Sequence, residues 1–165
     1  MPNQFNGLPT HPLVIHAAVV FVLLSALLGV MFVLPRFRSW SRWPLLLVSL
    51  ASVVSVYLAK LSGDALRNTL SGGQSAAWNA SPIGKLVNQH AHLGNQLLII
   101  TAAYAVVAIA AFVLTRGRAS FMGITRWVVC VLLVVGAVAL GVQTYRVGDA
   151  GARAVWNPTG TLNYG

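Results

Sequence analysis

The sequence predicts an all-α integral membrane protein, a bundle of four transmembrane helices built as two similar helical hairpins. Composition is the first observation: of 165 residues, 57% are hydrophobic and only 8% are charged. A soluble domain carries about 25% charged residues, so this chain has too few for a surface that faces water. The second observation is four long apolar runs separated by short polar segments. Such a chain buries its apolar surface in lipid.

The boundaries follow from where the apolar runs start and stop within a single membrane domain, residues 1–165. A helix crosses the hydrocarbon core with about 20 apolar residues, and each run is close to that length. The spans are expected at about 13–34, 44–62, 92–114 and 121–143, with an outer loop at 63–91 and an outer tail at 147–165.

Local signals refine the helix ends. Ser81-Pro82 is a good N-cap and first-turn pair, so the third helix is expected to begin before the membrane. The second helix is expected to continue beyond its span to Gly72-Gly73. Small residues recur every fourth position on this helix, which predicts close packing in lipid: Ala51, Ser55, Ala59 and Gly63. A stripe with the same spacing on the fourth helix is Ala137, Gly141, Tyr145 and Asp149.

The basic residues predict the orientation. Six arginines lie in the two short turns at 36–42 and 116–126, whereas five Lys and Arg residues are spread over the other side with both acidic residues. By the positive-inside rule, the arginine turns are cytoplasmic and both termini are outside. A net charge of +9 could also suggest nucleic acid. Membrane topology already accounts for these cations, so no nucleic-acid partner is expected.

The two halves of the chain contain similar motifs in the same order, which predicts an internal repeat. In the first half, Arg42-Trp43 leads through an apolar run to Gly63-Asp64. In the second half, Arg126-Trp127 leads through a similar run to Gly148-Asp149. Histidines also stand near the outer end of the first helix of each half, at positions 11 and 16 and at positions 90 and 92. These features recur in the same order.

Two motifs resemble those of the DUF2231 family of small four-span bacterial membrane proteins: LPTHPLVIH at 8–16 and YRVGDAGARAVW at 145–156. The resemblance covers nearly the whole chain and implies a bacterial cell membrane protein. It also implies a place near electron transfer, because relatives are sometimes joined to cytochrome c-like or Rieske-type domains. Many relatives carry histidine where this chain has Asp149, which argues against a histidine ligand at that position here.

The histidines and acidic residues all fall at the outer ends of the predicted helices, and haem b is the first explanation. A bis-histidine site needs two imidazoles on different helices at matching depth. His16 and His92 fit best, with His90 as a substitute. Arg67 or Arg153 would pair with the haem propionates. The expected function is then a haem-binding electron-transfer subunit that works with redox partner proteins and is not an enzyme by itself.

Two alternatives remain open at this stage. A divalent metal ion could bind a mixed nitrogen and oxygen site made of His16, His92, Asp64 and Asp149, although no metal-binding motif supports it. Alternatively, these residues could be structural, with Asp64–Arg67 and Asp149–Arg153 as local ion pairs and His11 as a helix cap. The protein would then be an assembly or structural subunit of a membrane complex, and its small-residue faces allow a homo-oligomer.

Overall fold

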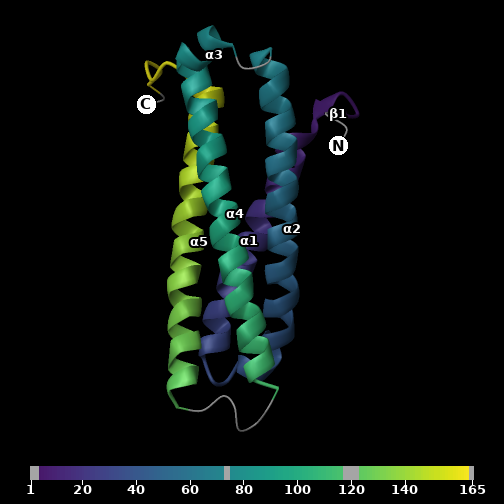
Figure 1. Ribbon diagram of the computed structural model, residues 1–165, viewed down its shortest axis with the longest axis vertical. Coiled ribbons are helices and arrows are strands. Elements are labelled where there is room, and N and C mark those ends of the chain that lie inside the picture. Colours follow the sequence, from purple (N-terminus) through teal and green to yellow (C-terminus); the bar gives the residue numbers. More distant parts are fainter. Residues whose placement is uncertain (1–3, 73–74, 117–122, 164–165) are drawn as a thin grey trace.

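The computed structural model describes residues 4–72, 75–116 and 123–163 and is a bundle of four long helices (Figure 1). These are α1 (Thr10–Val33), α2 (Arg38–Ser71), α4 (Pro82–Leu114) and α5 (Ile124–Trp156), and the short helix α3 (Ala76–Ala80) precedes α4. All four long helices are apolar enough to cross a membrane. The predicted all-α fold with four spans is confirmed.

The packing order sets which helices face each other. Helix α1 packs against α2 and α5, and α4 packs against the same two helices, so α1 and α4 lie on one diagonal of the bundle. Both chain ends and α3 lie at one end (Figure 1). We call this end, where α1 begins with His11, the histidine end. The opposite end, where α2 begins at Arg38, is the arginine end.

The ends of two helices match the local sequence signals. Ser81 caps α4, because its hydroxyl accepts a hydrogen bond from the Gly84 amide at 3.1 Å, and Pro82 is the first helical residue. Gly72 ends α2 in the left-handed conformation, with a φ of 55°. A left-handed residue at this position stops a helix, and glycine adopts it without a Cβ clash.

Other boundaries differ from those predicted. Helix α2 already begins at Arg38, so Trp40 and Trp43 lie in its first turns and not in an interfacial loop. Helix α5 continues to Trp156, where a tail was expected from residue 147. Alternating alanines in this part of α5 favour a helix, and the Asp149–Arg153 pair supports it. The predicted start of the fourth span at Phe121 lies outside the described residues.

The N-terminal segment forms a small β-hairpin before α1. Strand β1 (Gln4–Phe5) pairs antiparallel with β2 (Leu8–Pro9). The connecting residues Asn6 and Gly7 both have positive φ, at 51° and 80°. Two positive φ angles are what a type I′ turn requires, and Asn-Gly is its preferred sequence. The sequence Asn6-Gly7 therefore indicates a β-hairpin turn at this position.

The buried positions repeat between the two halves of the chain. Buried residues of α1 recur in α4 at a spacing of 79 positions, as from Ala18 to Leu97. Buried residues of α2 recur in α5 at a spacing of 88 positions, as from Ser41 to Val129. In this register Gly63 corresponds to Gly151, whereas the sequence comparison matched it with Gly148. The predicted repeat was therefore out of register by three residues.

The middle of the bundle is held by one large side chain and one pair of hydroxyls. The Tyr104 ring lies against Gly29 of α1 and Gly136 of α5, where a Cβ atom would collide with it. Its hydroxyl donates a hydrogen bond to the Ser25 carbonyl at 3.3 Å. The Ser25 and Ser49 hydroxyls are 2.7 Å apart and join α1 to α2. In lipid, close packing and such hydrogen bonds hold helices together.

Candidate functional site

Two histidines face each other inside the bundle near the histidine end. His11 on α1 and His90 on α4 come from diagonal helices, and their ring centroids are 6.1 Å apart with an interplanar angle of 80°. Both side chains are partly buried. From the sequence, His11 was expected to be a cap and His90 only a substitute ligand. The contact between these two side chains was not predicted.

Each ring is fixed by a backbone carbonyl of a neighbouring helix. His11 Nδ1 lies 3.1 Å from the Ala59 carbonyl oxygen of α2, and His90 Nδ1 lies 2.9 Å from the Val147 carbonyl oxygen of α5. A carbonyl only accepts hydrogen bonds, so Nδ1 carries the proton in both rings. Within the described ranges, no hydrogen bond engages either Nε2 atom. Both Nε2 lone pairs are therefore left for a ligand.

The rings fit against two glycines that occupy equivalent places in the repeat. A Cβ at Gly63 would lie 3.0 Å from His11 Cε1, and a Cβ at Gly151 would lie 3.0 Å from His90 Cε1. The neighbouring buried residues of α2 and α5 are also small: Ala59, Ser62, Ala150 and Ala154. Ser62 also places its hydroxyl 3.1 Å from His11 Nδ1. Small residues on these two helices thus make room for the histidine pair.

Arg67 adds a buried donor on α2, one helical turn beyond Gly63. Its Nε atom has no hydrogen-bond partner among the described residues. The expected Asp64–Arg67 pair does not form, because Asp64 binds Lys60 at 2.6 Å. A buried N–H without an acceptor is costly, so Arg67 remains a candidate for binding an anionic group.

Asp149 and Arg153 form the ion pair that their spacing predicts. Arg153 Nε lies 2.9 Å from an Asp149 carboxylate oxygen, on a side chain that is 65% exposed. Arg153 Nε donates to both carboxylate oxygens of Asp149, at 3.1 and 2.9 Å. Since its Nε is already bound to a carboxylate, Arg153 is a poorer candidate than Arg67 for an anionic cofactor group.

His16 and His92 are exposed and bind only within their own helices. His16 Nδ1 contacts the Pro12 carbonyl oxygen one turn earlier. His92 Nε2 accepts a hydrogen bond from the Gln96 amide at 3.1 Å, and Gln96 in turn accepts one from buried Gln143 of α5. The structure thus links His92 to α5 and brings neither residue to the other or to the His11–His90 pair.

The proposed mixed metal site is not assembled either. Over the described ranges, no group of three or more His, Cys, Asp or Glu residues is close enough to hold a metal ion. Asp64 and Asp149 are engaged with Lys60 and Arg153. The set of His16, His92, Asp64 and Asp149 is therefore dispersed over separate helices and faces.

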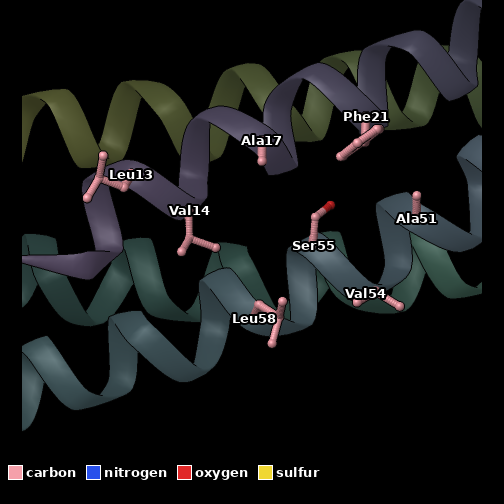
Figure 2. Close-up of a pocket in the computed structure, with 8 residues that line it drawn as sticks. All are labelled: Leu13, Val14, Ala17, Phe21, Ala51, Val54, Ser55 and Leu58. Carbon is pink, nitrogen blue, oxygen red and sulfur yellow. The ribbon is translucent and has the colours of Figure 1, made fainter. Parts of the chain in front are cut away.

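A groove of about 560 Å³ lies between α1 and α2 just below this level (Figure 2). It is lined by Leu13, Val14, Ala17, Phe21, Ala51, Val54, Ser55 and Leu58. Figure 2 shows that the Ser55 hydroxyl is the one polar group among these side chains, and it already donates to the Ser52 carbonyl at 3.0 Å. The side chains that line the groove offer no nitrogen or sulfur atom to a metal.

Comparisons with known proteins agree with this membrane architecture. No curated protein and no solved structure matches the chain. A family model does match, described as "Predicted membrane protein (DUF2231)", and the match covers residues 7–161, from the N-terminal hairpin to beyond α5. With four membrane-spanning helices and a match over nearly its whole length, the chain belongs to the DUF2231 family of predicted membrane proteins.

Proposed function

We propose that this protein is a small electron-transfer subunit of the cell membrane that binds haem b between His11 and His90. One observation carries the proposal: two imidazoles from diagonal helices meet inside the bundle, each with Nδ1 bound to a carbonyl and with no hydrogen bond at Nε2 from any described residue. Metal-bound histidines usually have this arrangement, since the Nδ1–H bond fixes the tautomer and orients the ring.

The surroundings of the pair are consistent with this ligand. With their ring centroids 6.1 Å apart, His11 and His90 are close enough that both would hold the iron of one haem. Arg67 supplies a buried donor without an acceptor, which suits a propionate. When bound, haem b supplies a one-electron iron couple. The apolar bundle around His11 and His90 would exclude water and so raise its reduction potential.

The number of protein ligands favours haem over a bare divalent ion. Haem iron takes four nitrogens from the porphyrin and needs only two axial ligands from the protein. A zinc site usually needs four ligands, or three and a water molecule. His11 and His90 supply both protein ligands of a haem site but only two of the four ligands of a zinc site. The axial role predicted for His16 and His92 is therefore reassigned to His11 and His90 in this proposal.

The test is a dithionite-reduced minus oxidised absorption spectrum of the full chain, purified after expression with added haem precursor. A b-type band with about one haem per chain is expected for the unaltered protein. His11→Ala and His90→Ala should each remove this band, because one axial ligand cannot hold a low-spin bis-histidine centre.

Matched controls come from the two exposed histidines. His16→Ala and His92→Ala remove imidazoles of the same helices without touching the pair, so the band should keep its position and intensity. Absence of a b-type band from the unaltered protein would refute haem binding. Loss of the band in the two control variants, with retention in His11→Ala and His90→Ala, would restore the pairing predicted from sequence.

A further inference from the structure

The arginine end carries a cluster of positive charge. Arginines 36, 42, 116 and 126 stand there on or beside the ends of the helices. The chain has only two acidic residues, Asp64 and Asp149, and both are in ion pairs at the histidine end. Neither acidic side chain is therefore close to these four arginines.

One part of this end is organised around aromatic rings at the seam between α2 and α4. Trp43 of α2 and Phe112 of α4 pack edge to face, with centroids 4.5 Å apart. The Arg116 guanidinium lies over both rings, 4.7 Å from the Phe112 centroid and 5.8 Å from the Trp43 centroid. Cation–π contacts of this kind hold an arginine in place while its N–H edge stays free for an anion.

Arg42 stands next to Trp43 in the first turns of α2, and its Nε atom is buried without a hydrogen-bond partner. Apart from the ring contacts of Arg116, neither the Arg42 nor the Arg116 guanidinium has a hydrogen bond or ion pair in the part of the chain that the structure describes. An unsatisfied buried N–H is costly. The buried donor of Arg42 and the ring-held guanidinium of Arg116, both at the arginine end, are therefore available to an acceptor from outside the described residues.

We infer that the α2–α4 seam at the arginine end binds the phosphate of an anionic phospholipid, with Arg42 and Arg116 as its ligands. The location selects a lipid, because exposed Trp40 and Trp127 mark this end as the boundary between hydrocarbon and headgroups. Basic pockets between transmembrane helices bind anionic headgroups in this way. The planar guanidinium matches two phosphate oxygens at once.

The inference is tested by the melting temperature of the purified full chain in a neutral detergent, titrated with phosphatidylglycerol or with phosphatidylcholine of the same acyl chains. Phosphatidylglycerol should raise the melting temperature at a lower concentration than phosphatidylcholine. Arg42→Gln and Arg116→Gln should each shift the midpoint of the phosphatidylglycerol titration by at least about tenfold, the value of one hydrogen bond between charged groups.

Arg36→Gln and Arg126→Gln are the matched controls, because these exposed arginines lie at the same end but outside the seam. Their midpoints should stay within about twofold of the unaltered protein. Arg116 is exposed, so Arg116→Gln tests the idea even if Arg42→Gln fails to fold. Equal shifts in all four variants would mean diffuse surface charge and overturn the site. Equal stabilisation by phosphatidylcholine, or by inorganic phosphate alone, would overturn the anionic lipid.

Discussion

At the residue scale, the direction in which a histidine leaves its helix decides what it can bind. Residues advance by about 100° around an α-helix, so His11 and His16 point roughly 140° apart. His11 therefore reaches Ala59 and His90 in the interior, whereas His16 is exposed. His90 and His92 differ in the same way. The sequence identifies both pairs as unusual groups but does not say which member points inward.

The Tyr104 contact leads to a prediction about stability. Gly29→Ala should lower the free energy of unfolding by about 1–3 kcal/mol, because the new Cβ collides with the Tyr104 hydroxyl. Tyr104→Phe removes that hydroxyl, so the double variant should regain most of the loss. The measurement is unfolding in mixed detergent micelles.

Gly141→Ala is the control for this experiment. Gly141 is also helical, but nothing lies within 4 Å of a Cβ at that position. This variant should be unchanged or more stable by up to about 1 kcal/mol, since alanine favours a helix over glycine. If Tyr104→Phe fails to rescue Gly29→Ala, the hydroxyl contact is not the cause of the loss.

At the element scale, α5 shows why a fixed spacing of four misidentifies a buried face. Four residues turn by about 400°, so each step of an i+4 stripe drifts by roughly 40° around the helix. The predicted stripe starts at buried Ala137 but reaches Tyr145, which is 74% exposed. The buried face instead alternates steps of three and four through Leu133, Ala137 and Leu140. This alternation keeps a helix in contact with its neighbours.

The rotation of α5 about its own axis also predicts how fast introduced cysteines react. In a Cys130→Ala background, Tyr145→Cys should react with a water-soluble maleimide at least about tenfold faster than Ala150→Cys. The reason is that Tyr145 is exposed and Ala150 is 4% exposed against the bundle. Labelling of the folded protein in detergent provides the measurement. Equal rates in both variants would contradict the observed rotation of α5.

At the scale of the whole molecule, the charged groups are separated along the bundle axis. Both acidic residues and all four histidines belong to the histidine end, while the arginine end has cations without acids. The orientation predicted from the sequence, in which the arginine end faces the cytoplasm, depends on the arginines alone. Electron carriers would then approach the histidine pair from outside, and anionic lipids of the inner leaflet would meet the α2–α4 seam.

Reporter fusions test this orientation. Alkaline phosphatase joined to the C-terminus should be active, because that enzyme folds only outside the cytoplasm, and a green fluorescent protein at the same place should stay dark. Insertion of the reporters between residues 116 and 123 should give the opposite result. A fluorescent C-terminal fusion would place both termini in the cytoplasm and reverse the proposed sides.

The class of protein and the ends of several helices were accessible from the chain alone. Hydrophobicity is a property of consecutive residues, so four membrane-spanning helices follow from the length of the apolar runs. The Ser81-Pro82 start and the Gly72 stop depend on hydrogen bonds and φ angles within one turn. Asp149 and Arg153 pair because residues four apart are neighbours on any helix.

Only the tertiary structure decided which groups meet. His11 contacts His90 because α1 and α4 lie on one diagonal and both rings turn inward over Gly63 and Gly151. That outcome depends on the rotation and depth of helices about 80 positions apart in the chain, as the 79-residue spacing between Ser25 and Tyr104 illustrates. Local sequence constrains neither quantity, since both arise from close packing among all four helices.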